Sequence, residues 1–121
     1  MAKFNLYVQI GPPTATAGGA EKAMVKVFQK YPNVIAVLED MGMPGIDWIK
    51  VNAPEHIVEC GIAEANGAVI AGALASEGFM PFLHSFSFAV IERAYNQIRQ
   101  SILVDRFNVK ITARDGVWGD L

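Results

Sequence analysis

The sequence predicts an α/β fold with three layers, in which helices cover both faces of a mostly parallel sheet. Two observations support this prediction. Short continuous apolar runs, of which Val34 to Leu38 is the clearest, have the composition of buried parallel strands. Segments with helical spacing alternate with these runs, and strand–helix–strand units of this kind form parallel sheets with right-handed crossovers.

Length and composition limit the classes of protein to consider. The 121 residues, 52% hydrophobic and 18% charged, suit one globular domain with a modest core. A net charge of −2 gives no electrostatic reason to expect nucleic acid or an anionic membrane as a partner. The single cysteine, Cys60, cannot form an internal disulfide, so we expect a reducing, cytoplasmic location.

The first half of the chain contains one helix and one clear strand. Residues 3–10 alternate as a strand or extended arm, and we expect residues 1–19 to form an extended leader. A helix is predicted from Ala20 to Lys30, with Met24 and Phe28 on its apolar side. The strand at residues 34–38 follows, while the segment 48–51 is too short to assign.

The second half repeats the alternation of strands and helices. We predict strands over residues 56–60, 79–86 and 109–113, and helices over 62–77 and 89–103. Gly78 suits the C-terminal cap of the first of these helices. The apolar face of the second helix is expected to consist of Ile91, Ala94, Tyr95, Ile98 and Ile102.

Glu64 is the main candidate for a functional residue. It lies in the first turn of a helix made largely of Ala and Gly, where the helix dipole favours a carboxylate. One interpretation is a structural first-turn glutamate. The other is a site at an interface, because residues as small as Gly72 would let the backbone of another chain approach closely.

Several segments closely resemble the pyrimidine-binding domain of the transketolase family. They are residues 54–66 (PEHIVECGIAEAN), 77–82 (EGFMPF), 85–86 and 93–99 (RAYNQIR). The resemblance is strong over residues 34–111. It implies a thiamine-diphosphate-binding fold, with residues 1–121 forming a single pyrimidine-binding domain that is expected to be truncated at its C-terminal end.

The resemblance also implies roles for residues near the cofactor. Glu64 would hydrogen-bond the pyrimidine nitrogen of thiamine diphosphate, and such a carboxyl must be able to hold a proton, which burial favours. We expect Ile62, Val69 and Ile70 to provide apolar surroundings for it. Phe86 matches the first aromatic residue of the ring pocket. The second falls on Ala89, so Phe88, one position away, is the candidate for that wall.

Asp40 and Arg93 are further cofactor-binding candidates on the same grounds. Asp40 matches an acidic residue at a strand end, and the alternative is an ordinary turn residue. Arg93 belongs to a motif that orders the cofactor pocket, and the alternative is a salt-bridged surface arginine. A zinc site at His84 is not expected, because no second His or Cys at metal-ligand spacing accompanies it. One interpretation of His84 is a residue near the cofactor pocket, and the preferred one is a half-buried histidine with satisfied hydrogen bonds.

A metal site is not expected in this chain. Thiamine enzymes hold the diphosphate through a divalent cation bound by a Gly-Asp-Gly motif, which Gly119-Asp120-Leu121 only begins. Mg²⁺ or Ca²⁺ would therefore enter through a partner chain. We expect a homodimer, or a heterotetramer with a diphosphate-binding subunit.

The function implied by the resemblance is transfer of a two-carbon ketol unit between sugar phosphates by a transketolase-type enzyme. This chain would supply the pyrimidine-binding part and would be inactive alone. A deoxyxylulose-phosphate synthase and the beta subunit of an oxoacid dehydrogenase use related domains. A third interpretation is a non-catalytic remnant that serves only as an interaction module.

Overall fold

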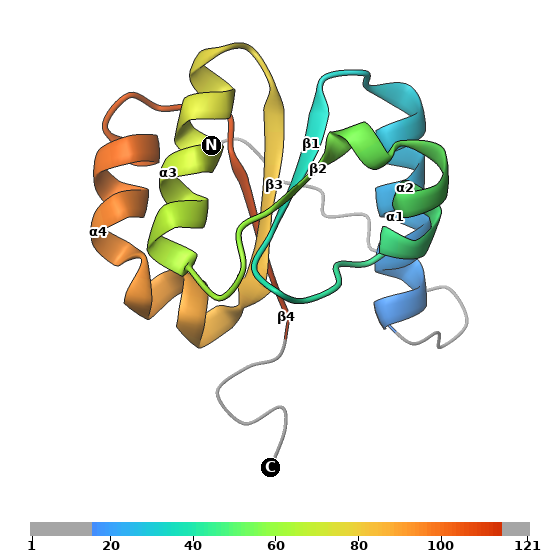
Figure 1. Cartoon of the computed structure of the whole chain (residues 1–121), viewed down its shortest axis with the longest axis horizontal. Helices are drawn as coiled ribbons and strands as arrows, with labels where there is room; N and C mark the ends of the chain where they lie inside the picture. The colour runs from blue at the N-terminus through green and yellow to red at the C-terminus, as the bar shows by residue number, and fades with distance from the viewer. Residues whose placement is uncertain (1–15, 115–121) are drawn as a thin grey trace, which may run out of the picture.

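The predicted fold class is confirmed. A computed structural model describes residues 16–114, which form a four-stranded, entirely parallel sheet in the order β2-β1-β3-β4. Helices α3 and α4 cover one face, and α1 and α2 cover the other (Figure 1). The strands are β1 (Val34–Leu38), β2 (Ile57–Glu59), β3 (Met80–Phe86) and β4 (Lys110–Arg114).

The helices differ from the predicted ones mainly at their ends. They are α1 (Thr16–Lys30), α2 (Ile46–Asn52), α3 (Glu64–Ser76) and α4 (Tyr95–Ile98). Because α1 begins at Thr16, residues 16–19 are helical and not part of a leader. The unassigned segment 48–51 lies within α2, whose Ile49 is fully buried. The expected strand at 3–10, and Asp115 onward, lie outside the described residues.

Successive residues of β1 point into two different cores, one on each face of the sheet. Ile35 and Val37 pack with α3 and the helical segment after β3, while Val34, Ala36 and Leu38 pack with α1 and α2. A strand buried on both faces reads as a continuous apolar run, which is why this strand was predictable. Glu39 continues the alternation and is therefore directed toward α3.

The long helix predicted over residues 89–103 contains wider turns than an α-helix. Segments η2 (Ala89–Arg93) and η3 (Arg99–Leu103) are π-helical, and α4 lies between them. The buried face is Val90, Ala94, Ile98 and Ile102, whereas Ile91 and Tyr95 are exposed. The prediction of that face was wrong at these two positions, because a repeat of four residues exceeds the 3.6 of an α-helix and the π turns supply the difference.

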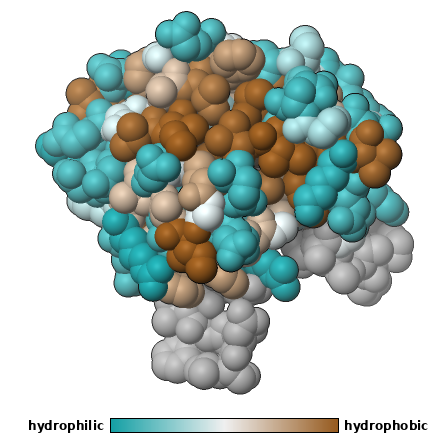
Figure 2. All heavy atoms as spheres, in the orientation of Figure 1, coloured by the Kyte–Doolittle hydropathy of each residue, from teal (hydrophilic) through white to brown (hydrophobic). Residues whose placement is uncertain are grey.

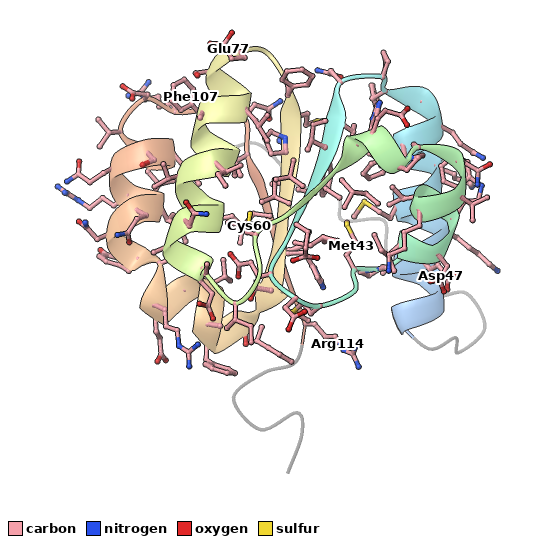
Figure 3. All side chains as sticks on the ribbon, viewed as in Figure 1. Met43, Asp47, Cys60, Glu77, Phe107 and Arg114 are labelled. Carbon is pink, nitrogen blue, oxygen red and sulfur yellow. The ribbon has the colours of Figure 1, made fainter. Side chains whose placement is uncertain are left out.

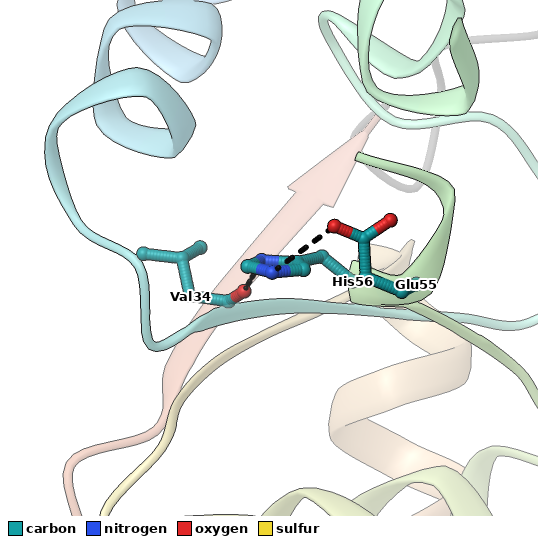
Figure 4. A network of polar contacts seen from close by, with 3 residues as sticks. All are labelled: Val34, Glu55 and His56. Atoms are coloured by element: carbon teal, nitrogen blue, oxygen red, sulfur yellow. Dashed lines mark hydrogen bonds and ion pairs between the residues drawn. The ribbon is translucent and has the colours of Figure 1, made fainter. Parts of the chain in front are cut away.

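The amino ends of β1 and β2 are joined by a histidine. The Nδ1 of His56 donates a hydrogen bond of 2.8 Å to the carbonyl oxygen of Val34, and its Nε2 lies 3.7 Å from a carboxylate oxygen of Glu55 (Figure 4). Phe28 of α1 lies against the same ring, with centroids 6.4 Å apart. This contact fixes the short edge strand β2 and leaves the opposite, carboxyl edge of the sheet for other groups.

The small residues of α3 pack within the chain. A Cβ at Gly72 would clash with the carbonyl oxygen of Ser101 and lie 3.1 Å from its Cβ. The expectation that Gly72 lies on a surface for another chain is therefore wrong, because the close approach it permits is taken by η3. Hydrophobic atoms do gather on the face in Figure 2, across the middle of the molecule around the edge strand β2.

Replacing Gly72 by alanine should lower the free energy of unfolding of the chain itself. Overpacking of this kind costs about 1–3 kcal/mol, and the backbone of Ser101 cannot yield as a flexible side chain would. Urea unfolding followed by circular dichroism measures the loss.

Gly19→Ala is the matched control, since Gly19 lies in α1 with nothing within 4 Å of an added Cβ. Such a helix position should gain about 0.4–1 kcal/mol. Equal stability of Gly72→Ala and the parent would show that α3 does not depend on this contact.

Candidate functional site

Glu64 begins helix α3 at the carboxyl edge of the sheet. Gly61 turns the chain there with a φ of 68°, Ala63 is the N-cap residue, and Glu64 is the first residue of the helix. The N-cap provides no side-chain hydrogen bond to the free N–H groups, and only 8% of Glu64 is exposed. The carboxyl therefore lies near the positive end of the helix dipole with little contact to water.

The carboxyl of Glu64 is paired with Arg93. The Nη1 of Arg93 donates a hydrogen bond of 2.9 Å to Oε1 of Glu64, and the arginine side chain is 58% exposed against 10% for the glutamate. A pair with one partner in solvent contributes little stability by itself. It does orient the carboxyl, because Arg93 comes from η2, directly after the third strand.

Two aromatic rings lie beside this ion pair. Phe86 ends β3 and stacks on Phe88, with centroids 5.9 Å apart and planes at 17°. The Arg93 guanidinium lies 5.8 Å from the Phe88 centroid. Ala89 is buried, so the second aromatic wall comes from Phe88, which is 42% exposed. The structure thus brings four of the predicted residues together: Glu64, Phe86, Phe88 and Arg93.

The expected apolar surroundings of Glu64 are different. Ile62 is 74% exposed and Val69 is 44% exposed, so neither encloses the carboxyl. Both point outward because Gly61 and the helix start turn the opposite face of α3, which carries Gly67 and Ala68, toward the sheet. The burial of Glu64 therefore comes from the side of the strand ends.

Asp40 does not join this group. It is exposed and has a φ of 56°, a left-handed conformation that Asp tolerates better than most residues. Its backbone N–H donates a 2.7 Å hydrogen bond to Oε1 of Glu59, which also accepts one from the N–H of Gly61 at 3.1 Å. Glu59 thus joins the two turns that follow β1 and β2. Within residues 16–114, the Asp40 side chain has no hydrogen bond or ion pair.

The acidic side chain that does enter the site is Glu39, which sequence reasoning missed. Only 5% of it is exposed, and neither carboxyl oxygen has a hydrogen-bond partner among the described residues. It occupies the space that the missing Cβ of Gly67 leaves, since a Cβ there would clash with Oε1 of Glu39. The sequence signal for this orientation was the alternation of side chains along a strand. Glu39 lies two residues after Val37, so its side chain is on the same, α3-facing side of the sheet.

Burial is the main cause that raises the pKa of Glu39 above its ordinary 4.5. The Ser85 hydroxyl, nearby but without hydrogen-bond geometry, opposes this rise, and the charges of Glu64 and Glu59 add to it. The pKa of the Cys60 thiol is raised as well. Burial is the larger cause, and the negative charges of Glu39 and Glu59 add to it. In Figure 3, Cys60 lies beside the start of α3, while Glu77 lies at its far end.

A hollow of about 720 Å³ lies at the same edge of the sheet but on the face covered by α1 and α2. It is lined by residues of α1, the loop after β1, the start of α2, and strands β3 and β4. Figure 3 labels three of them, Met43, Asp47 and Arg114. Open α/β sheets bind ligands beyond the carboxyl ends of their strands, so this hollow is a second candidate for ligand binding.

His84 of β3 lines this hollow. Its Nδ1 lies 2.8 Å from Oγ1 of Thr112, while its Nε2 has no hydrogen-bond partner in the described part of the chain. The residue is only 2% exposed, so the interpretation of a half-buried, satisfied histidine is wrong. Burial lowers the pKa of His84 below its ordinary 6.5, the charge of Arg114 lowers it further, and Thr112 opposes both. The neutral ring therefore dominates at pH 7.

Residues 16–114 contain no group of three or more His, Cys, Asp or Glu side chains arranged to hold a metal ion. None of their helices is long and apolar enough to cross a membrane.

Comparison with known proteins identifies relatives of this arrangement. A 1-deoxy-D-xylulose-5-phosphate synthase of Synechococcus sp. (strain JA-2-3B'a(2-13)) is 30% identical over 88 residues, which are 72% of this chain and 13% of that protein. A 6-deoxy-6-sulfo-D-fructose transketolase subunit of Clostridium sp. (strain MSTE9) is 29% identical over 100 residues, or 81% of this chain and 31% of the subunit. The chain thus spans less than a third of either relative.

A solved structure and a family profile agree with these relatives. The structure, described as a split gene transketolase in an inactive beta4 tetramer, superposes with a TM-score of 0.69 and 32% identity, over 78% of this chain and 32% of that one. The profile of the family "Transketolase, pyrimidine binding domain" matches residues 13–120. With the parallel sheet and the group around Glu64 in place, these matches show that the chain belongs to the transketolase pyrimidine-binding domain family.

Proposed function

We propose that this chain supplies the pyrimidine-binding part of a thiamine-diphosphate-dependent enzyme of the transketolase type. The observation that carries the proposal is the position of Glu64, a carboxyl shielded from solvent at a helix start beside two stacked aromatic rings. An aminopyrimidine ring is flat and has a basic nitrogen at its edge. An aromatic wall next to a carboxyl fits such a ring.

Glu64 would hold and move a proton at the pyrimidine nitrogen. When bound, thiamine diphosphate supplies a thiazolium carbon whose proton is removed by the cofactor's own aminopyrimidine. A carboxyl hydrogen-bonded to the ring nitrogen promotes the tautomer required for that step. Arg93 fixes Oε1 of Glu64 at 2.9 Å, which leaves Oε2 as the oxygen available to the ring.

The aromatic pair would position the ring and exclude water from it. Phe88 is 42% exposed while it contacts both Phe86 and the Arg93 guanidinium, so the exposed part of its ring is proposed to contact the planar cofactor ring. Offset stacking contributes about 0.5–1.5 kcal/mol beyond the buried area. Phe86 and Phe88 are therefore proposed as cofactor contacts, with Arg93 as the residue that orients both Glu64 and Phe88.

The reaction proposed is transfer of a two-carbon ketol unit between sugar phosphates. The hollow lined by His84 and Arg114 lies at the same sheet edge and is the candidate place for the sugar phosphate. Deoxyxylulose-phosphate synthesis is the second candidate, which the match to the Synechococcus synthase favours.

We retain a cytoplasmic location as a proposal from the single cysteine.

The diphosphate and its divalent cation would be held by a partner chain. We propose a heterotetramer with a diphosphate-binding subunit, or a homodimer if further sequence supplies that site. The description of the related split-gene transketolase as an inactive beta4 tetramer supports the need for a second kind of subunit. Asp40, whose side chain is exposed, is proposed to contact the cofactor only as part of such an interface.

The isolated chain should bind thiamine diphosphate weakly even with Mg²⁺ present. The group around Glu64 offers contacts to the ring and none to two phosphates, so the affinity should appear only when a diphosphate-binding subunit is added. Isothermal titration calorimetry with and without that subunit measures the difference. A micromolar dissociation constant for the chain alone would mean that it contains a diphosphate site.

Glu64→Gln should impair proton exchange at the thiazolium carbon in the complete assembly. Glutamine keeps the size and a hydrogen bond but cannot transfer a proton as a carboxyl does. General acid–base groups contribute about 10²–10⁴-fold, so exchange should slow at least about 100-fold while cofactor affinity changes less. Deuterium exchange followed by NMR measures the rate.

Glu77→Gln is the control for this experiment, because Glu77 is exposed at the other end of the same helix. Glu59 is unsuitable, although its strand position suggested an uninvolved residue, since it accepts hydrogen bonds from both strand-end turns. If exchange in Glu64→Gln stays within about threefold of the parent, the barrier has changed by well under about 1 kcal/mol. Glu64 would then be a structural first-turn glutamate.

A further inference from the structure

We propose that Glu39 is a positioning residue that holds a proton beside Glu64, so that the two carboxyl groups share one negative charge. The inference rests on the function proposed for Glu64. It concerns a residue that the family resemblance did not single out. Its basis is a buried carboxyl with no hydrogen-bond partner, located where a carboxylate would be poorly tolerated.

The first step in the argument is the location of the Glu39 carboxyl. Glu39 is 5% exposed, and both of its oxygens are buried without a partner among the described residues. Leaving an ionised carboxylate in such a position costs several kcal/mol, and a group in that situation usually becomes neutral instead. The carboxyl lies against Gly67 of α3, where an added Cβ would meet Oε1 of Glu39.

The second step is the charge that surrounds Glu39. Glu64 faces it from α3 and Glu59 from β2, and both carboxylates make its own negative charge less favourable. The thiol of Cys60 lies on the same side, and the hydroxyl of Ser85 is the nearby polar group from β3. No positive group among the described residues pairs with Glu39, because the bond from Arg93 goes to Glu64.

The third step follows from comparing the two carboxyls. Glu64 has a helix start and Arg93 to stabilise a negative charge, whereas Glu39 has neither. When two neighbouring carboxyls have unequal surroundings, the proton resides on the one with the less favourable site for charge. In the free chain the proton is therefore on Glu39.

The test is a carbon-13 NMR titration of the glutamate carboxyl groups in the free chain, assigned with Glu39→Gln. The Glu39 midpoint is expected above the ordinary 4.5. It should move down in Glu64→Gln, which removes the neighbouring charge, and stay unchanged in Glu77→Gln. A midpoint at or below 4.5, or one that Glu64→Gln leaves in place, would overturn the proposal.

A second measurement gives a stability readout. A raised pKa in the folded state means that the stabilising contribution of Glu39 is complete below pH 4.5 and is lost as pH rises through the folded value. The urea midpoint of Glu39→Gln should therefore exceed that of the parent at pH 8, and the difference should shrink toward pH 4.5. If Glu39→Gln is less stable than the parent by the same margin at pH 8 and at pH 4.5, the proposal is contradicted.

If Glu39→Gln does not fold, the Glu39 carboxyl signal is assigned through its own backbone and side-chain carbons, and the titration of the parent and Glu64→Gln still decides the question. All of these measurements use the free chain without cofactor. If the assembly fails to bind the cofactor, the proposed function is contradicted and this inference stands. If Glu39 titrates at or below pH 4.5, this inference is contradicted and the proposed function stands.

Discussion

The close packing of helix α3 against the sheet on one side and against η3 on the other is the constraint on which the site depends. Two residues without a side chain make it possible. Gly72 lets the backbone at Ser101 approach, and Gly67 leaves room for the carboxyl of Glu39. With the helix held at this distance, its first residue, Glu64, comes within hydrogen-bond reach of Arg93 and beside the aromatic pair. A helix with larger residues would stand further off and separate these groups.

The π-helical turns make a related contribution on the other side of the same interface. They let Val90, Ala94, Ile98 and Ile102 share one buried face although the spacing is too wide for a regular α-helix. The turn at η2 also contains Arg93. The π turn at η2 thus serves both the packing of the core and the orientation of Arg93. Changes in the core near Val90 are therefore expected to affect Glu64 through Arg93.

Much of the fold could be predicted from the sequence, for reasons visible in particular segments. The run at Val34 to Leu38 is buried on both faces, and the helix at Ala20 to Lys30 has a clear stripe with Met24 and Phe28 buried. Ile91 and Tyr95 were misplaced because the prediction assumed a regular helical period. The spacing of four residues from Val90 to Ile102 is present in the sequence, but it was interpreted with the period of a regular α-helix.

The candidate site was predictable in part. Glu64, Phe86, Phe88 and Arg93 were proposed through family resemblance, and the structure brings them together without testing their roles. Asp40 was preferred to Glu39 because a strand-end motif was read by position. Glu39 continues the alternation of β1 on the side of Val37 and faces α3, whereas Asp40 lies in a left-handed turn with a φ of 56° and is exposed. Such a turn depends on the hydrogen bond to Glu59, a contact between segments 19 residues apart.

The most direct test of the central claim is to locate the pyrimidine ring in the assembled enzyme. Nuclear Overhauser effects would be measured between the cofactor's pyrimidine methyl group and labelled aromatic side chains of this chain, bound to a diphosphate-binding subunit. The account predicts contacts to the rings of Phe86 and Phe88. Contacts to His84, on the opposite face of the sheet, or a bound cofactor with no contact to either phenylalanine, would contradict it.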